Sequence, residues 1–240
     1  MDNDINSIDD NNISNSNIIL STKNLTKIYQ SGETQSFAAL DNVSIDIKRS
    51  ELTIIKGRSG SGKTTLLNML GALDQPTSGS VMMNGVNYSE LSRYEMEEFR
   101  RTHMGFVFQS VALFPIMSAY ENVDFALRLA EYEGDRDERI KEVMSLVGIE
   151  DRMLHTPEEM SGGEQQRVAI ARAIAPGPDV LFADEPTGAL DTLTGIKVVT
   201  LFKKLIEKEG ISIVMTTHDP GLMQMGDTVY EMSDGVIIGE

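Results

Sequence analysis

The alternation of apolar and polar positions divides this chain into short strands and amphipathic helices. Apolar residues at every second position over 43–47, after a β-rich stretch at 18–25, predict an antiparallel sheet region. Continuous apolar runs predict buried strands at 52–55, 105–108, 180–183 and 211–216. Helical spacing predicts a helix with its apolar face at Leu66, Met69, Leu70 and Leu73, and further helices at 90–101, 162–175 and 194–207. Because strands and helices alternate, we expect an α/β fold with a mostly parallel sheet and flanking helices.

Residues 110–160 form a block of a different kind. Glu, Arg and Leu recur there at helical spacing with few β-branched runs, so we expect the block to be largely helical. It carries 12 acidic and 5 basic residues, which makes its surface locally negative. Within it, the apolar stretch 111–115 either belongs to the internal core or receives a segment of a partner protein.

Composition and charge narrow the function. The 240 residues carry 21 Lys plus Arg against 37 Asp plus Glu, a net charge of −16, so we expect no nucleic-acid partner and no adhesion to anionic lipid. Without cysteine there are no disulfides, catalytic thiolates or zinc-thiolate sites. No stretch reaches the roughly 20 apolar residues of a membrane span and no secretory signal is visible, so we expect a cytoplasmic protein without direct membrane insertion.

Residues 1–17, rich in Asn, Ser and Asp, are expected to be a disordered acidic tail.

The segment GRSGSGKTT joins a predicted strand to a predicted helix and matches the phosphate-binding pattern G-x-x-x-x-G-K-[ST]. Its glycines let consecutive backbone N–H groups point at one anion, to which the following helix adds its positive end. Lys63 is expected to reach the outer phosphates, and Thr64 to offer its hydroxyl to Mg²⁺. The alternative is a glycine-rich turn with a solvated lysine. The matched residues are Gly57, Arg58, Ser59, Gly60, Ser61, Gly62, Lys63 and Thr64.

Two adjacent carboxylates, Asp184 and Glu185, follow the predicted strand at 180–183. Open α/β sheets bind their ligands at the carboxyl ends of the strands, so we expect both side chains beside the bound phosphates. Asp184 would hold Mg²⁺ through its water shell, and Glu185 would polarise a water that attacks the terminal phosphorus. The alternative is an acidic junction between a strand and a turn before Pro186.

A second helix end has the features of an anion site. Ser161 and Glu164 form a predicted capping box around Gly162 and Gly163, which are poor helix formers. A helix N-terminus with a serine hydroxyl binds anions, yet the sequence has one nucleotide-binding loop to fill it. Two copies would solve this, each offering its helix end to the nucleotide held by the other. The alternative is an ordinary capped helix.

Together these segments resemble the ATP-binding subunits of ABC transporters. MSGGEQQRVAIARA is similar to the signature motif, ADEPTGALD to the Walker B strand with its D-loop, and TTHDP to the switch-histidine segment. With LNMLGALDQPTSGSV, the sequence looks most like the branch of macrolide exporters, lipoprotein-releasing ATPases and antimicrobial-peptide transporters. The resemblance covers 18–240 as one ATP-binding domain. It implies a P-loop NTPase with a RecA-like sheet, an antiparallel β subdomain and an α-helical signature subdomain at about 110–165.

The resemblance also implies roles for residues that would contact the adenine base and Mg²⁺. Tyr29 would stack on adenine, and Thr65 would bind the nucleotide beside Thr64. Gln109 would sense Mg²⁺ and the attacking water, because its amide accepts from one partner and donates to another. Without the resemblance, Tyr29 would be interpreted as a packing residue. Gln109 would be interpreted as an ordinary polar residue at the end of a strand.

Further roles concern the γ-phosphate and the dimer. His218 would contact the γ-phosphate and orient Glu185, whereas taken alone it would be a hydrogen-bonded structural histidine. Asp191 would lie in the D-loop at the dimer interface, and the signature residues that would touch ATP across it are Ser161, Gly162, Gly163 and Glu164. His103 and His155 match no motif and are expected to be surface residues.

Two positions depart from the family pattern. Ser50 stands where a glycine usually precedes Glu51, which puts a local turn in doubt. Ala189 stands where Asn or Ser is common, which bears on communication between subunits. Neither removes a catalytic group, and since Glu185 is present, hydrolysis is expected.

The expected function is an ATPase motor. Two copies close over two ATP molecules, hydrolysis with Mg²⁺ reopens them, and the cycle moves integral membrane permease subunits that export or extract a peptide, lipoprotein or antibiotic. The protein would lie peripherally on the inner face of the cell membrane, held there by the permease. The alternatives are an ABC-type ATPase that acts as a regulatory or mechanotransmission switch without transport, a soluble DNA-associated ATPase, and a P-loop kinase. A kinase would have no use for the capped glycine helix end.

Overall fold

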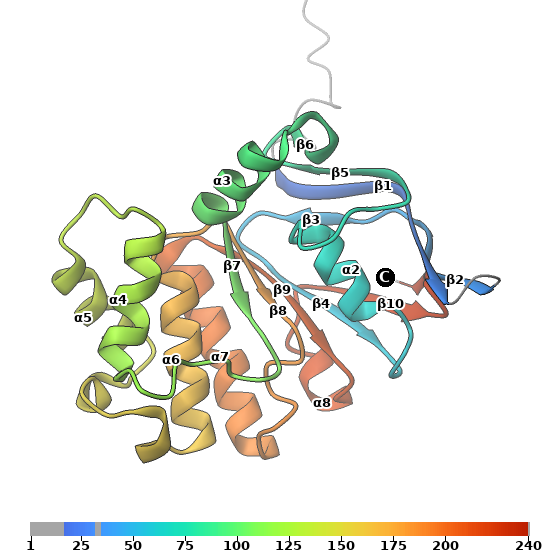
Figure 1. Cartoon of the computed structure of the whole chain (residues 1–240). Coiled ribbons are helices and arrows are strands. Elements are labelled where there is room, and N and C mark those ends of the chain that lie inside the picture. Colours follow the sequence, from blue (N-terminus) through green and yellow to red (C-terminus); the bar gives the residue numbers. More distant parts are fainter. Residues whose placement is uncertain (1–16, 32–34, 240) are drawn as a thin grey trace, which may run out of the picture.

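The computed structural model describes residues 17–31 and 35–239. All of the predicted tail except Asn17 therefore lies outside the described residues. Two sheets form the framework, and helices pack against the larger one (Figure 1). Within the described part of the chain, no helix combines the length and the apolar character that crossing a membrane requires.

The N-terminal part folds into an antiparallel sheet, as its alternating pattern predicts. Its strands are β1 (Ile18–Ser31), β2 (Gln35–Val43), β3 (Asp46–Lys48), β5 (Ser78–Met83) and β6 (Val86–Asn87). β1 pairs with β2, β3 and β5, and β6 follows β5 at the edge. In the register of β1 with β2, Tyr29 lies directly opposite Phe37.

The second sheet is mostly parallel. Its strands are β4 (Leu52–Gly57), β7 (Met104–Val107), β8 (Val180–Ala183), β9 (Ser212–Thr217), β10 (Thr228–Ser233) and β11 (Val236–Gly239). The order is β11-β10-β4-β9-β8-β7, with β11 antiparallel to β10 and the others parallel. β8 and β9 are buried along their whole length, which explains their continuous apolar runs. The carboxyl ends of β4, β9, β8 and β7 consequently share one edge of the sheet.

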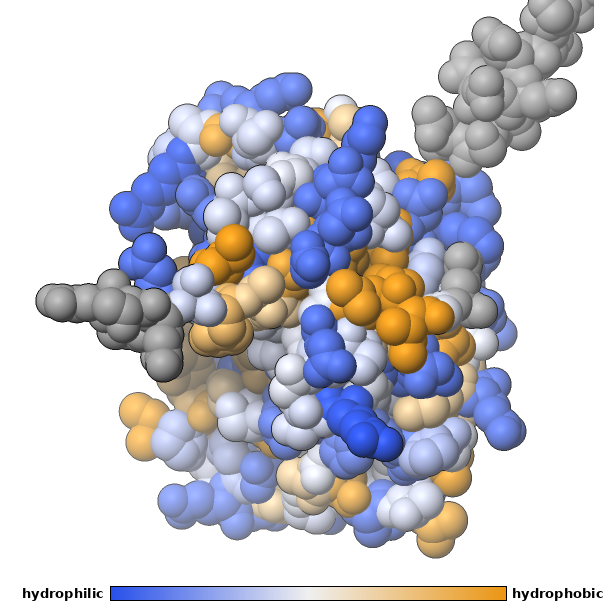
Figure 2. Space-filling view, turned by 90° about the vertical axis from the view of Figure 1, so that its right-hand side faces the viewer, coloured by the Kyte–Doolittle hydropathy of each residue, from blue (hydrophilic) through white to orange (hydrophobic). Residues whose placement is uncertain are grey.

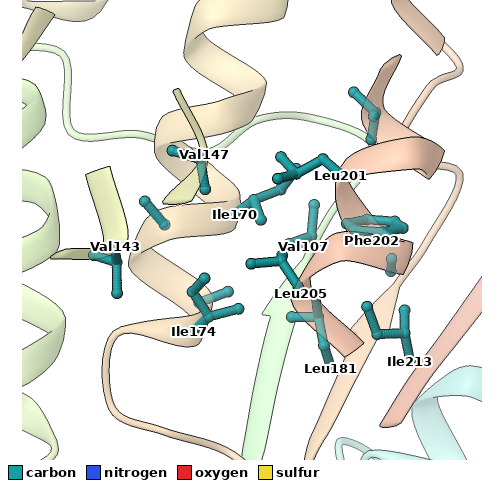
Figure 3. Close-up of a cluster of buried hydrophobic side chains, with 14 of the residues drawn as sticks. Val107, Val143, Val147, Ile170, Ile174, Leu181, Leu201, Phe202, Leu205 and Ile213 are labelled. Carbon is teal, nitrogen blue, oxygen red and sulfur yellow. The ribbon is translucent and has the colours of Figure 1, made fainter. Parts of the chain in front are cut away.

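Helices cover both faces of the parallel sheet. They are α2 (Lys63–Leu70), α3 (Arg93–His103), α4 (Ala119–Leu129), α5 (Arg136–Leu146), α6 (Gly162–Ile174), α7 (Thr192–Glu209) and α8 (Pro220–Met223), with short 3₁₀ turns η2 (Tyr88–Glu90), η3 (Glu150–Arg152) and η4 (Pro157–Glu159). Residues 110–160 are thus largely helical, as expected. Side chains of α5, α6 and α7 pack with Val107, Leu181 and Ile213 on one face (Figure 3). On the other face, Leu66, Met69 and Leu70 of α2 pack with Phe182 and Val214.

One predicted helix is shorter than its apolar spacing suggests. α2 ends at Leu70, Gly71 caps it, and Ala72 turns the chain with a φ of 52°. The prediction that Leu73 belongs to the apolar face was therefore wrong: Leu73 lies beyond the helix and is 45% exposed.

Ser50 adopts the turn that a glycine usually makes. Its φ is 53°, in the left-handed region that favours glycine. Its backbone N–H donates to Ser212 Oγ at 2.9 Å, and its hydroxyl donates to the Gly210 carbonyl oxygen at 3.0 Å. These bonds stabilise the strained backbone, so the turn before β4 is kept despite the serine.

Candidate functional site

The loop between β4 and α2 is shaped by glycines where a side chain would not fit. Gly60 and Gly62 have φ values of 79° and 102°. A Cβ on Gly62 would lie 2.5 Å from the Ala39 carbonyl oxygen, and one on Gly57 would lie 2.5 Å from that of Met232. No side chain of the described residues caps α2, so its first N–H groups are available to an anion.

Lys63 begins α2 and is buried under the loop, with 5% of its side chain exposed. Its Nζ donates to the carbonyl oxygens of Gly57 at 2.9 Å and Arg58 at 3.1 Å, and lies 3.7 Å from Glu185 Oε1. The ammonium group therefore sits between the loop and the strand-end carboxylates. Ser61 is buried in the same loop, and its hydroxyl has no partner among the described residues. The exposed loop residues are Arg58, Ser59, Gly60 and Thr64.

Asp184 connects the phosphate-binding loop to two strands. Its Oδ1 accepts from Thr64 Oγ1 at 3.2 Å and from Thr216 Oγ1, on β9, at 2.7 Å. The Thr216 hydroxyl also accepts from the backbone N–H of Glu185 at 2.9 Å. Our sequence reasoning missed Thr216, although a fully buried hydroxyl inside the apolar run at 211–216 was the available signal.

Glu185 lies where the predicted catalytic side chains meet. Its φ of 43° is unusual for a glutamate, and strained residues of this kind cluster at functional sites. Its Oε2 lies 3.2 Å from Nδ1 of His218, whose side chain is 64% exposed. Gln109, two residues beyond β7, is also exposed, and a Cβ built on Gly188 would lie 3.2 Å from its Nε2 and 3.6 Å from Glu185 Oε2. Gln109 and Glu185 therefore flank the same backbone position.

The predicted capping box is present at α6. Glu164 Oε2 accepts from the Ser161 backbone N–H at 2.8 Å, and Ser161 Oγ accepts from the Glu164 N–H at 3.4 Å. Arg152 adds an ion pair at 2.9 Å. The hydrogen bonds from Ser161, followed by those from Arg152, lower the pKa of Glu164 to about 2. The helix end is thus well formed without a ligand.

The two glycines of α6 differ in their surroundings. A Cβ on Gly163 would lie 2.9 Å from Thr194 Cγ2, so the neighbouring helix of the same chain already favours glycine there. A Cβ on Gly162 would have its nearest neighbour, a Leu190 methyl, at 3.7 Å. Contacts within the chain therefore disfavour a side chain at position 163 and leave room for a Cβ at position 162.

Asp191 caps α7 beside this helix end. Its carboxylate accepts from the Thr194 N–H at 3.1 Å and the Thr194 hydroxyl at 2.6 Å, and these bonds lower the pKa of Asp191. A cavity of about 390 Å³ opens here, lined by Ser161, Gly162, Gly163, Arg167, Ala189, Leu190, Asp191, Thr194 and Lys197. No residue of the phosphate-binding loop lines it, so the two predicted anion sites are separate within one chain.

Tyr29, the predicted adenine partner, is half-buried and tied to residues that the sequence reasoning left unassigned. Its hydroxyl donates to Asp74 Oδ2 at 2.9 Å, and Lys27 pairs with Oδ1 of the same carboxylate at 2.8 Å. Burial, followed by the effect of Asp74, raises the pKa of Tyr29, while a hydrogen bond with Thr65 lowers it. Tyr29 therefore lies beside the helix that follows the phosphate-binding loop.

The two unassigned histidines are not free surface residues. Both are half-buried. His103 Nδ1 lies 2.6 Å from Asp179 Oδ2, which ties the end of α3 to the residue before β8. His155 lies with its Nε2 3.4 Å from Arg152 Nη1. His103 keeps 38% of its side chain exposed, so it lies at the surface as expected, and the packing of α3 pairs it there with Asp179.

Comparison with known proteins decides the family. The protein-family model described as ABC transporter matches residues 40–188. This chain belongs to the ABC transporter family. It is 42% identical over 225 residues to the uncharacterized ABC transporter ATP-binding protein MJ0796 of Methanocaldococcus jannaschii, covering 91% of this chain and 95% of MJ0796. It is also 40% identical, over 94% of its length, to the macrolide export ATP-binding/permease protein MacB of Vibrio parahaemolyticus, of which it spans 34%.

Solved structures agree with this assignment. The dimeric structure of the MJ0796 cassette matches with a TM-score of 0.84 at 41% identity, over 92% of this chain and 97% of that chain. A second dimeric structure of MJ0796, in a post-hydrolysis state bound to ADP and Pi, matches with a TM-score of 0.83. The ABC cassette fold and the family resemblance are confirmed. The chain is an ABC transporter ATP-binding protein and an ATPase of that type.

Proposed function

We propose that this chain drives a membrane exporter as an ATPase that closes as a homodimer over two ATP molecules. One observation carries the proposal: the groups suited to hydrolysis converge at one edge of the sheet, while the open helix end at Ser161 belongs to a separate cavity. In a dimer, the backbone of residues 161–163 of the second copy would contact the nucleotide that the first copy binds. Each nucleotide would then lie between the phosphate-binding loop of one copy and the α6 N-terminus of the other. The dimeric structures of MJ0796 support this arrangement.

Different residues of the chain bind the phosphates and activate the attacking water. The N–H groups of the loop and of the first turn of α2 bind the phosphate oxygens, and Lys63 adds a positive charge within 3.7 Å of Glu185. Glu185 polarises the attacking water as a general base. His218 Nδ1 lies 3.2 Å from the Oε2 of this carboxylate, and Gln109, which flanks the same backbone position as Glu185, would contact the same water. Water activation and charge neutralisation thus come from different strands of one sheet edge.

The residues beside the loop fit Mg²⁺. Thr64 Oγ1 and Asp184 Oδ1, 3.2 Å apart, are the hard oxygen donors that this ion prefers, and Gln109 would supply an amide oxygen. When bound, the ion would neutralise charge on the phosphate oxygens. The described residues contain no cluster of three or more His, Cys, Asp or Glu side chains that could hold a metal ion.

The likeness to MacB supports export as the direction of transport and a permease as the partner. The surface on either side of Gln109 in the sequence suits such a partner, because Phe108, Phe114 and Ile116 are 41%, 40% and 88% exposed. The buried Asn122 fixes this segment by bonding the N–H of Phe114 at 2.9 Å and its carbonyl oxygen at 3.2 Å. Of the two alternatives for residues 111–115, we favour partner contact. The protein then lies at the inner face of the membrane through its permease.

Substitution Glu185→Gln tests the proposal, because it removes the base and keeps the shape of the side chain. We expect ATP to bind, turnover to fall by about 100-fold or more, and a dimer to accumulate with ATP in size-exclusion chromatography. Lys63→Ala serves as the matched control and should form no ATP-dependent dimer. An E185Q protein that stays monomeric at saturating ATP would refute the homodimer, and normal turnover would refute the assignment of the base.

A further inference from the structure

The Ser161 hydroxyl lies at the helix end that contacts the other copy's nucleotide in the proposed dimer, yet it is already engaged within its own chain. A serine hydroxyl has one proton, and that of Ser161 donates to Glu164 Oε2 at 2.7 Å. The same carboxylate oxygen accepts from the Ser161 backbone N–H at 2.8 Å. To donate to a phosphate oxygen, the hydroxyl must turn away from Glu164. Ser161 then stands between two anions, the carboxylate and the phosphate.

Arg152 bonds the other oxygen of this carboxylate. Its Nε donates to Glu164 Oε1 at 2.9 Å, and its Nη1 lies 3.4 Å from Nε2 of His155. When the hydroxyl turns to a phosphate, Oε1 keeps the bond from Arg152 and Oε2 keeps the bond from the Ser161 N–H. The carboxylate therefore retains a partner on each oxygen, and the guanidinium balances its charge.

The surroundings of this ion pair are rich in negative charge. A cavity of about 490 Å³ lies beside it, and the charged residues among the described ones that line it are Glu150, Asp151, Arg152, Glu164 and Arg167. The cluster lies on the helical side of the molecule, near α5 and α6 (Figure 1), away from the face that carries β2, where apolar patches stand among polar residues (Figure 2). Without Arg152, one cation would face three carboxylates in this lining, which opposes the approach of a polyanion to the α6 N-terminus.

We infer that Arg152 is a positioning residue of the nucleotide site that two copies share: it neutralises the Glu164 carboxylate, so that the Ser161 hydroxyl can donate to a phosphate oxygen of the other copy's nucleotide. This inference rests on the proposed function, since the contact exists only in the dimer. A carboxylate and a phosphate that bond the same hydroxyl lie about 5 Å apart. Like charges at this distance repel unless a cation balances one of them. Arg152 acts through Glu164, because no described residue of the phosphate-binding loop lines the cavity beside it.

The test measures ATP-dependent dimerisation in the Glu185→Gln background, in which bound ATP persists. Analytical ultracentrifugation at saturating ATP gives the dimer Kd of each variant. Arg152→Gln should raise this Kd by roughly 10-fold or more, because it leaves an unbalanced carboxylate at both sites of each dimer. Glu164→Gln keeps the acceptor of the capping box and removes the charge, so its dimer should be at least as tight as that of the parent.

The double variant separates a role in charge balance from a merely structural one. With both substitutions the Kd should return to within about threefold of the E164Q value, because Arg152 then has no charge to balance. If the guanidinium only held η3 against α6, the double variant would dimerise as weakly as R152Q, and that result would overturn the inference. An R152Q dimer as tight as the parent would overturn it as well. ATP binding by dilute monomers, followed with a fluorescent ATP analogue, should be unchanged in R152Q.

The matched control is Arg128→Gln, which changes the net charge by the same amount. Arg128 Nε lies 2.6 Å from Asp124 Oδ2 within α4, and its side chain is 62% exposed. We expect the dimer Kd of R128Q to equal that of the parent. A Kd raised as much as in R152Q would show that the loss of any surface cation weakens the dimer, and would overturn the inference. Failure of the proposed function looks different, because the E185Q parent itself would then stay monomeric at saturating ATP, and the inference would fall with it.

Discussion

At the scale of single residues, one hydroxyl organises the candidate active site. Thr216 is fully buried, donates to Asp184 at 2.7 Å and accepts from the Glu185 N–H at 2.9 Å. It therefore fixes the side chain of one carboxylate and the backbone of the next, whose φ of 43° requires support. Positioning of this kind cannot be read from a motif, because it arises only when β8 and β9 pair.

Replacing Thr216 by Val tests this role with a side chain of nearly the same shape. Thr216→Val leaves the Glu185 N–H without its acceptor and Asp184 Oδ1 with Thr64 as its remaining donor, so kcat should fall by about 10-fold or more, and the free energy of unfolding by about 1–3 kcal/mol. Thr216→Ser retains the hydroxyl and should keep most of the activity. The measurements are steady-state ATPase kinetics and urea unfolding. Normal kcat in T216V would show that the hydroxyl does not position the carboxylates.

At the scale of elements, the capping pattern predicted the start of α6 correctly, whereas the helix predicted from position 90 begins at Arg93 and the one predicted from 194 begins at Thr192. The pattern S-x-x-E correctly placed the start of α6, and capping boxes with the same pattern begin α3 and α4. Apolar spacing alone extended the first helix to Leu73, because periodicity does not register that Gly71 and Ala72 turn the chain. Strand cores were predictable because they are buried on both faces. The Lys27–Asp74 pair was not, since it joins residues 47 apart in sequence.

The capping box of α6 should make stability depend on pH. The pKa of Glu164 is lowered to about 2 by Ser161 and Arg152, whereas an unfolded glutamate titrates near about 4.3. A lowered pKa means that the charged form stabilises the folded state, fully above pH of about 4.3 and progressively less as pH falls towards 2. Comparison with Glu164→Gln, which keeps a capping box without the charge, isolates this effect.

The expected result is a difference in unfolding free energy between the two proteins that is constant from pH 7 to about pH 5 and shrinks below about pH 4. Denaturant unfolding monitored by circular dichroism at several pH values measures it. A difference that stays constant down to pH 3 would mean that the charge of Glu164 is not what stabilises the helix start.

At the scale of the whole molecule, the parallel sheet explains why so much of the site could be predicted. Each catalytic motif follows a strand in the sequence, and parallel strands bring their carboxyl ends to one edge, so Lys63, Asp184, Glu185 and His218 had to meet once the strands paired. The net charge of −16 does not oppose nucleotide binding there, because Lys63 and backbone N–H groups supply a local positive field. The N-terminus of α6, at Ser161, does not lie at this edge of the sheet.

That separation leads to a prediction about mixed dimers. Lys63→Ala disables the phosphate-binding loop, and Gly162→Asp places a negative charge at the helix end, where a Cβ fits because its nearest neighbour, a Leu190 methyl, lies 3.7 Å away. Each variant alone should be inactive. In a dimer of one K63A and one G162D copy, one composite site carries both defects and the other carries none.

Random pairing of the two variants in equal amounts makes half of the dimers mixed, and each mixed dimer has one intact site of two. We therefore expect about a quarter of the unmodified ATPase activity per subunit when both are mixed, if sites act independently, and none from either alone. The measurement is ATPase activity against mixing ratio, which should peak at equal amounts. A control mixture of K63A with E185Q should stay inactive, because in this geometry both residues serve the nucleotide of their own copy, so each composite site has one defect. Recovery in that control, or none in the first mixture, would contradict two nucleotides shared between two copies.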